Sequence, residues 1–204
     1  MRIIAGQYRG RQIRTTEGPG YRPATGKVRE SLFSMLESMG VVWPDVRVAD
    51  IFAGSGSLGL EALSRGALQA VFVEKAAKAA ALIRSNLNSL GVDSARGVLI
   101  KNDALRWLAR REGDGFDLVF IDPPYGQGLL VPTLRLLLES GGLAREGLLC
   151  VEVEAGLTLD NPVHPDLDLV RDKLYGQTRI CIWRANSSAS LCTPAPSILS
   201  PTDI

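Results

Sequence analysis

Short apolar segments alternate with amphipathic segments of helical length from Val46 onward, and this alternation restricts the fold more than any other feature. The apolar segments have the length of strands, and the segments between them combine helical spacing with good helix formers. Parallel strands need crossover helices of this kind, so the order predicts an open, doubly wound, mostly parallel α/β sheet. The predicted strands are 46–52, 70–74, 98–101, 116–121 and 148–153. The predicted helices are 57–65, 76–90, 104–111 and 130–140.

The two ends of the chain depart from this alternation. Residues 167–174 and 178–184 have the pattern of two strands joined by a turn, which predicts an antiparallel C-terminal hairpin and seven strands in all. Glycines and arginines among a few apolar residues predict a small β arm over residues 1–25, followed by a helix from 27 to 38. We therefore expect an arm over 1–25, one domain over 26–185, and a flexible tail rich in Ser, Pro and Thr over 186–204.

Composition narrows the class of protein. The 204 residues, of which 46% are hydrophobic and 22% charged, suffice for one full core. No apolar stretch approaches the ~20 residues of a membrane span, and the start lacks a secretory signal, so we expect a cytoplasmic protein that binds no membrane. The three cysteines are far apart and there is one histidine, which argues against a metal site or a disulfide framework.

Positive charge is concentrated at the start of the chain. Residues 1–30 contain seven basic and two acidic side chains, whereas the whole chain has a formal net charge of only +1. Arginine forks match phosphate oxygens, and their binding releases condensed counterions. The distribution indicates either a face that binds nucleic acid or a solvated basic surface.

A glycine-rich turn follows the first predicted strand and leads into a helix. It reads Asp50-Ile51-Phe52-Ala53-Gly54-Ser55-Gly56-Ser57-Leu58-Gly59 and satisfies the GxGxxG spacing of a nucleotide-binding loop. Glu74, at the end of the second strand, stands where a ribose-binding acid is expected. A dinucleotide and S-adenosylmethionine both fit, and Asp50 favours the second, because a carboxylate suits a cationic α-amino group better than a pyrophosphate. A purely structural turn is the alternative.

An acidic residue after the third strand adds to this candidate site. Asp103 can reach an adenine amino group, and it is equally suited to be the N-cap of the next helix. The candidate cofactor-binding residues are Asp50, Phe52, Ala53, Gly54, Ser55, Gly56, Glu74, Lys75, Asp103 and Ala104.

The segment Asp122-Pro123-Pro124-Tyr125 directly follows the fourth strand, at the edge where ligands bind in this class of sheet. Prolines fix φ and lack an N–H group, so the Pro123 carbonyl can point into a pocket as an acceptor. The exocyclic amine of a base is a weak nucleophile, because its lone pair is delocalised into the ring. Hydrogen bonds from its two N–H groups to Asp122 and Pro123 would aim that lone pair at a methyl carbon, while Tyr125 stacks on the base. The four residues therefore predict a catalytic loop for amine methylation, and a loop in which Asp122 caps a helix is the alternative.

Several segments together resemble the bacterial 16S ribosomal RNA guanine-N2 methyltransferase family. The similar segments are Arg2–Arg11, Arg22-Pro23-Ala24-Thr25 with Val28–Phe33 after it, and the glycine loop continued by Leu60–Arg65. The resemblance extends from about Arg2 to Arg184. Tyr125 stands where family members often carry Phe, and either ring offers a face for stacking.

The resemblance implies a Rossmann-like class I methyltransferase fold and S-adenosylmethionine as the methyl donor. It implies that the partner is 16S ribosomal RNA in the 30S subunit or in an assembly intermediate. Charge and resemblance together point to Arg9, Arg11, Arg22 and Arg29 as RNA contacts. We expect a monomer.

Other functions fit parts of the pattern. A DNA adenine-N6 or cytosine-N4 methyltransferase could use the same catalytic loop, although this chain has no room for a large target-recognition segment. An NAD(P)-dependent oxidoreductase could use the GxGxxG loop, but its proton donor would have to be His164, which lies between prolines in a loop of structural character. The intact Asp122 and Pro123 argue against an RNA-binding module without activity.

Overall fold

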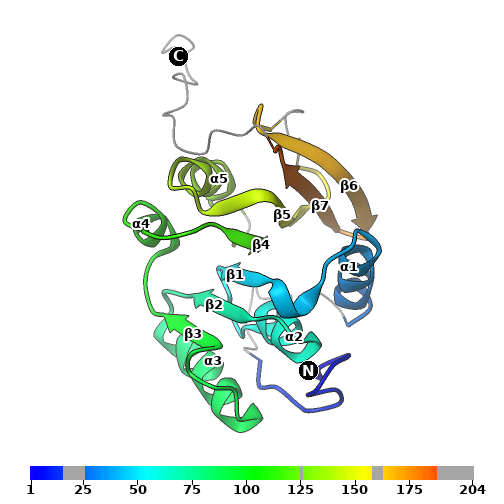
Figure 1. Cartoon of the computed structure of the whole chain (residues 1–204), viewed down its shortest axis with the longest axis vertical. Coiled ribbons are helices and arrows are strands. Elements are labelled where there is room, and N and C mark those ends of the chain that lie inside the picture. Colours follow the sequence, from blue (N-terminus) through cyan, green and yellow to red (C-terminus); the bar gives the residue numbers. More distant parts are fainter. Residues whose placement is uncertain (16–25, 125, 158–162, 188–204) are drawn as a thin grey trace.

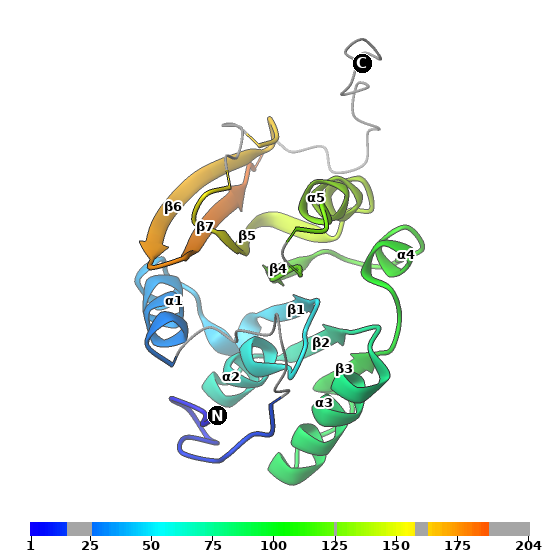
Figure 2. The same cartoon turned by 180° about the vertical axis from the view of Figure 1, so that it is seen from behind.

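The structure, a computed structural model, describes residues 1–15, 26–124, 126–157 and 163–187 (Figure 1). Four sequence predictions fall wholly or partly outside these residues: the end of the predicted arm over 16–25, the RNA contact of Arg22, the stacking of Tyr125, and the tail beyond residue 187. Within the described ranges a seven-stranded sheet is covered by helices on both faces (Figures 1 and 2). None of the described helices is long and apolar enough to cross a membrane.

The sheet has the strand order β3-β2-β1-β4-β5-β7-β6. Neighbouring strands are parallel from β3 to β5, whereas β7 runs antiparallel to both β5 and β6. The chain moves outward from β1 through β2 and β3 and then returns to place β4 on the other side of β1, which is the switch point where ligands bind in such sheets. The strands are β1 Arg47–Ile51, β2 Gln69–Val73, β3 Gly97–Ile100, β4 Phe116–Ile121, β5 Leu143–Glu154, β6 Leu167–Tyr175 and β7 Thr178–Ala185.

Helices α1, α2 and α3 pack on one face of the sheet, and α4 and α5 pack on the other (Figures 1 and 2). Each face therefore has its own apolar core. Phe72 and Phe120 belong to the first core, and Val119 and Trp183 belong to the second. The central strands are buried on both sides, which is why they are nearly continuous apolar runs. The helices are α1 Gly26–Ser38, α2 Ser57–Arg65, α3 Ala77–Leu90, α4 Ala104–Leu108 and α5 Leu130–Glu139, with a short 3-10 helix at Trp43–Asp45.

The predicted architecture is confirmed, including the antiparallel hairpin of β6 and β7. The bounds of α2 and β4 are those predicted, and α4 ends three residues earlier than expected. The largest difference is in β5, which begins at Leu143 rather than at residue 148. The register with β4 shifts between Phe116 and Leu118, and Glu146 has a φ of 58°. This irregularity lengthens the strand without a regular alternation of apolar residues, so periodicity alone does not reveal it.

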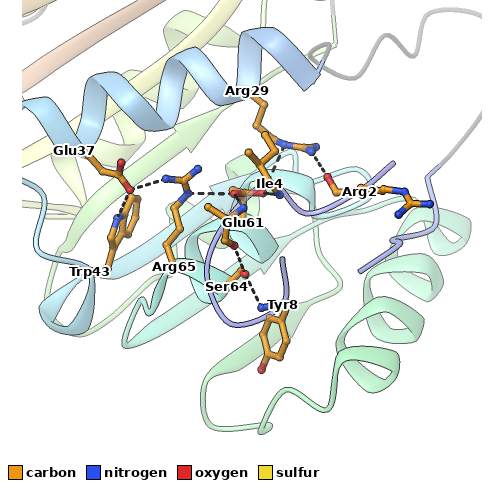
Figure 3. A network of polar contacts seen from close by, with 10 residues as sticks. Arg2, Ile4, Tyr8, Arg29, Glu37, Trp43, Glu61, Ser64 and Arg65 are labelled. Atoms are coloured by element: carbon orange, nitrogen blue, oxygen red, sulfur yellow. Dashed lines mark hydrogen bonds and ion pairs between the residues drawn. The ribbon is translucent and has the colours of Figure 1, made fainter. Parts of the chain in front are cut away.

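Residues 1–15 form an arm that packs against α2 (Figure 3). Ile4 and Ala5 donate their backbone N–H groups to the carboxylate of Glu61, at 2.9 and 3.0 Å. The backbone N–H of Tyr8 donates to the Ser64 hydroxyl at 3.0 Å. Two polar side chains of α2 thus accept hydrogen bonds from three backbone N–H groups of the arm.

The arm also contributes to the core. Ile3 and Ile13 are buried among the side chains of the face that carries α1, α2 and α3. Arg2 and Gln12 form an isolated antiparallel bridge that closes the arm on itself. Burial of the two isoleucines fixes the arm in place, which leaves the exposed arginines between them on a defined surface.

Candidate active site

The predicted site residues meet at the carboxyl edge of the parallel strands. Asp50 lies in β1, Glu74 follows β2, Asp103 follows β3 and Asp122 follows β4. Because these strands are neighbours and run in the same direction, their carboxyl ends reach the same edge of the sheet. The fold therefore brings four carboxylates from distant parts of the sequence to the switch point.

The glycine loop between β1 and α2 has a backbone that few side chains tolerate. Gly54 and Gly56 have φ values of 55° and 77°, and Phe52, at 64°, is one of two described residues other than glycine with a positive φ. A Cβ atom on Gly59 would lie 2.4 Å from Cε1 of Phe72. The glycines thus serve both a sharp turn and the close approach of α2 to the sheet.

Asp50, in β1, holds the start of α2 through a hydrogen bond. Its carboxylate is 2% exposed and accepts a hydrogen bond from the backbone N–H of Gly59, in the first turn of α2, at 2.9 Å. Burial, with a smaller contribution from the nearby charges of Asp122 and Glu74, raises the pKa of Asp50 to about 8, although the hydrogen bond from Gly59 opposes this rise. A buried acid surrounded by other acids favours a cationic ligand, which would stabilise its ionised form.

Glu74 and Asp103 are also held by backbone N–H groups. Glu74 accepts hydrogen bonds from Gly54, at 2.9 Å, and from Ala76, at 2.7 Å. One oxygen of Asp103 caps α4, as the sequence predicted, while the other lies 3.9 Å from the Lys75 ammonium group. Each carboxylate is oriented but keeps lone pairs for a ligand.

The remaining predicted cofactor residues lie in or beside these loops. The backbone N–H of Ala53 donates to the carbonyl of Val73, which fastens the loop to β2. Ser55 is buried, and its carbonyl accepts a hydrogen bond from the side chain of Asn86 in α3. Ala104 is buried at the start of α4.

The catalytic loop predicted from the sequence begins directly after β4. Among the described residues, nothing donates a hydrogen bond to the Asp122 carboxylate or forms an ion pair with it. Burial raises the pKa of this carboxyl group above its usual range. Pro123 is buried and Pro124 is exposed, while Tyr125 lies outside the description. Asp122 is only partly exposed and therefore offers an acceptor at the switch point that has no partner among the described residues.

The structure adds one acidic residue that the sequence prediction missed. Glu152, in β5, is 7% exposed and faces the same side of the sheet as Phe120 and Cys150. Burial, and then the charge of Asp122, raise the pKa of Glu152. The sequence feature that could have identified Glu152 is that it is the single charged residue within the apolar run 148–153.

The arginines predicted to bind RNA differ in exposure. Arg9 and Arg11 are exposed on the arm, and the Arg11 guanidinium donates to the carbonyl of Ser89 at 2.6 Å. Arg22 lies outside the described residues. Two of the four are therefore placed where phosphate could reach them.

The prediction for Arg29 is wrong. Its side chain lies between α1, the arm and α2 and is 1% exposed (Figure 3). The guanidinium donates to the carbonyl of Arg2 at 2.5 Å, and its Nε lies 3.9 Å from Glu61. Arg29 is thus a buried residue that joins the arm to the domain, because its position on α1 faces the core.

His164 belongs to the opposite edge of the sheet. It precedes β6, which starts at the end of the sheet away from the carboxyl ends of β1 and β4. Its Nδ1 accepts a hydrogen bond from the backbone N–H of Asp166 at 3.1 Å, which stabilises the turn before the strand. The residue is therefore not placed to act as a proton donor at the switch point.

Comparison with protein families gives a match over almost the whole described chain. A family model described as "Conserved hypothetical protein 95" matches residues 1–184. The chain belongs to this family. The match includes the arm, the glycine loop and the predicted catalytic loop, and it ends within the last strand.

Relatives and solved structures agree with this assignment. An Escherichia coli K12 protein named "Ribosomal RNA small subunit methyltransferase D" is 42% identical over 186 residues, which cover 90% of this chain and 89% of that protein. A Bacillus subtilis protein named "Putative rRNA methyltransferase YlbH" is 38% identical and covers 90% and 98%. The solved structure of the "Putative methyltransferase yhhF" from Escherichia coli superposes with a TM-score of 0.79 at 37% identity, covering 92% of this chain and 99% of that one. The family resemblance and the Rossmann-like methyltransferase fold expected from the sequence are both confirmed.

Proposed function

We propose that the protein transfers a methyl group from S-adenosylmethionine to the N2 amine of a guanine in small-subunit ribosomal RNA. The observation that carries the proposal is the Asp122 carboxylate, which is partly buried and has no partner among the described residues. It lies directly before the buried Pro123, at the edge that also holds the glycine loop. Family members named as ribosomal RNA methyltransferases support the class of substrate.

The residues present fit the donor. Gly54 and Gly56 leave the loop open to close approach, and Asp50 is a buried acid whose ionised form a cationic α-amino group would stabilise. Glu74 and Asp103 stand where the ribose and the adenine amino group would be recognised. A pyrophosphate would instead face several carboxylates, which weighs against a nicotinamide dinucleotide. When bound, S-adenosylmethionine supplies an electrophilic methyl group on a cationic sulfonium.

The catalytic loop would activate the amine by position. Asp122 and the Pro123 carbonyl accept the two N–H groups of the amine, so its lone pair faces the methyl carbon. Because methyl transfer would leave the amine nitrogen cationic, the Asp122 carboxylate would take up the proton that this nitrogen releases. The raised pKa of Asp122 makes that carboxylate a better proton acceptor. Positioning accounts for most of the rate, because the reacting groups are held in line.

The arm would supply much of the RNA affinity. Arg9 and Arg11 are exposed on a segment that Glu61 and Ser64 hold against the domain. We assign residues 1–25 to RNA binding and 26–185 to methyl transfer, with residues 186–204 not needed for either. The partner is 16S RNA in the 30S subunit or an assembly intermediate, and the protein acts as a monomer in the cytoplasm.

Labelled methyl transfer tests the proposal. The full chain is incubated with S-adenosylmethionine carrying a tritiated methyl group and with small-subunit particles, free 16S RNA or duplex DNA, and the labelled nucleosides are then identified. N2-methylguanosine in ribosomal RNA is the expected product. N6-methyladenine or N4-methylcytosine in DNA would replace the proposed substrate, and no transfer to any of the three would overturn the proposal.

A pair of variants links the activity to the site. Asp122→Asn should lower the transfer rate by ~100-fold or more while donor binding persists, because the amide lacks the charge that holds the amine and takes up its proton. Asp114→Asn, at an exposed aspartate in the turn before β4, is the matched control and should be unchanged. Equal rates in the two variants would exclude Asp122 from catalysis.

A further inference from the structure

Glu152 is a buried carboxylate that the methyl-transfer step proposed above does not use. The residue is 7% exposed near the carboxyl end of β5, and no hydrogen bond or ion pair to its carboxylate occurs within the described part of the chain. Its oxygens keep some contact with solvent, because Arg29 Nε is the one fully buried polar side-chain atom without a partner among the described residues. A ligand can therefore reach the carboxylate and supply the hydrogen-bond donors that it lacks.

The carboxylate lines a small hollow between α1, α2 and the sheet. The rest of the wall includes the apolar side chains of Leu32, Leu58, Phe120, Cys150 and Ile180. These groups cannot donate strong hydrogen bonds to Glu152. A ligand that reaches the mouth of this hollow with an N–H group would therefore meet an acceptor in an otherwise apolar wall.

Glu152 stands next to Asp122 across two neighbouring strands. Ile121 of β4 pairs with Val151 of β5 in parallel register, and Asp122 and Glu152 are the residues that follow. The two carboxylates belong to one group at the carboxyl edge, since the charge of Asp122 contributes to the raised pKa of Glu152. Two adjacent acceptors suit a ligand that presents a row of N–H donors.

We propose that Glu152 selects guanine by accepting the hydrogen bond of its ring N1–H, beside the N2 amine held by Asp122 and Pro123. This inference rests on the proposed function and assigns the recognition of the base to a residue outside the catalytic loop.

The chemistry of the bases explains why such a residue is needed. Asp122 and the Pro123 carbonyl can hold any exocyclic amine, so they do not distinguish guanine from adenine or cytosine. In guanine one of the two ring nitrogens next to the amine, N1, carries a hydrogen, whereas in adenine and cytosine the ring nitrogen next to the amine carries a lone pair. The N1–H of guanine would stabilise the ionised form of Glu152 against the protonated form that burial favours, whereas a ring lone pair would repel the ionised form. A site built to pair with an N–H rejects an analogue that lacks it.

The test first needs the target position, obtained from the labelled product of the wild-type protein. Small-subunit particles are then reconstituted with RNA that carries either guanine or 2-aminopurine at that position. The 2-aminopurine base keeps the exocyclic N2 amine but presents a lone pair at N1. The wild-type protein should lose about 10- to 100-fold in kcat/KM on 2-aminopurine, as expected when a hydrogen bond to a charged group is lost.

Glu152→Gln relaxes the requirement, because its amide can donate to the N1 lone pair and can accept from N1–H only without the charge. This variant should lose about 10- to 100-fold on guanine and should prefer 2-aminopurine relative to the wild type. A merely structural role for Glu152 would lower both rates alike. Glu154→Gln, two residues further along β5 and exposed, is the matched control and should behave as the wild type. Donor binding, measured by calorimetry, verifies that each variant is folded.

The outcomes separate this inference from the proposed function. If the wild type methylates guanine N2 but Glu152→Gln keeps the wild-type preference between the two bases, the role of Glu152 is overturned and the proposed function stands. If the wild type methylates adenine or cytosine, or transfers no methyl group, both are overturned. If Glu152→Gln fails to bind the donor, the wild-type comparison of guanine with 2-aminopurine decides, and equal rates there overturn the inference.

Discussion

The side-chain amide of Asn86, in α3, donates a hydrogen bond to the carbonyl of Ser55 in the glycine loop, at 3.2 Å. The same side chain pairs with the backbone of Arg14, donating to its carbonyl and accepting from its N–H, both at 2.9 Å. Asn86 is 1% exposed. One buried amide thus connects the end of the N-terminal arm to the loop that would bind the methyl donor.

Replacement of Asn86 should loosen both segments at once. Asn86→Ala leaves the N–H of Arg14 and two carbonyl groups without their partners, so we expect a loss of about 1–3 kcal/mol in the free energy of unfolding. Donor affinity should fall several-fold because the glycine loop loses a support. Urea unfolding and calorimetry measure the two effects. Asn88→Ala, at an exposed position of α3, is the control, and a donor affinity that stays constant in Asn86→Ala would contradict the coupling.

Gly6 provides a way to detach the arm without changing any charge. A Cβ atom there would lie 1.8 Å from the carbonyl oxygen of Ser64, in the backbone of α2, whereas a Cβ atom on Gly10 would meet nothing within 4 Å. Both glycines have positive φ, at 82° and 78°, so an alanine adds similar backbone strain at each. Gly6→Ala should therefore lower the free energy of unfolding by ~2 kcal/mol more than Gly10→Ala does, and it should expose the arm to proteases. Equal stability and equal cleavage would mean that the arm does not need this contact.

Much of the fold could be predicted because its signals are local. The strand Phe116–Ile121 and the helix Ser57–Arg65 have the predicted bounds, since an apolar run and a glycine turn mark their ends. Asp50, Glu74, Asp103 and Asp122 could be assigned to one site because the topology of a parallel sheet brings their strand ends together. The predicted sheet topology was therefore enough to predict that these four residues, far apart in the sequence, lie close together.

Arg29 and Glu152 show where this reasoning failed. Arg29 was assigned to RNA because it is one of several arginines near the N-terminus, but helical spacing places it with Leu32, Phe33 and Leu36 on the buried face of α1. Its partner Glu61 is 32 positions away, and a contact of that kind leaves no periodic trace. The sequence did not indicate a role for Glu152, because a single acidic residue in an apolar strand has no evident partner. The register of β4 and β5 places Asp122 beside it, and this register is known only from the structure.

Arg9 and Arg11 should determine how RNA affinity depends on salt. A double variant, Arg9→Ala with Arg11→Ala, removes two exposed cations and should weaken RNA binding while reducing the slope of log K against log salt by about 1 to 2. Filter binding at several salt concentrations measures both quantities. Arg110→Ala with Arg135→Ala removes the same charge from two exposed positions, one in the turn after α4 and one in α5, and it should leave the slope unchanged. The same slope in both double variants would refute the assignment of the arm to RNA binding.

Donor binding should release a proton from Asp50. Burial and neighbouring acids raise the pKa of Asp50 to about 8, so the free protein holds a proton there at pH 7. A cationic α-amino group favours the ionised carboxylate, and the affinity for S-adenosylmethionine should rise with pH by up to about tenfold per unit below pH 8. Calorimetry in phosphate and in Tris, which differ in ionisation enthalpy, counts the released protons. Asp50→Asn should abolish the buffer dependence, and a wild type without it would contradict the prediction.

The carboxylate of Asp122 should lower the stability of the free protein at neutral pH. Its pKa in the fold lies above its usual value because of burial, so the folded state binds a proton more tightly than the unfolded chain does. The free energy of unfolding therefore falls as pH rises from about 4 towards neutrality. Asp122→Asn cannot ionise and should exceed the wild type by on the order of 1–3 kcal/mol at pH 8, with the difference vanishing near pH 4. Urea unfolding at the two pH values measures this difference, with Asp114→Asn as the control. A variant that is less stable than the wild type at pH 8 would show that the ionised Asp122 has a stabilising partner in the fold.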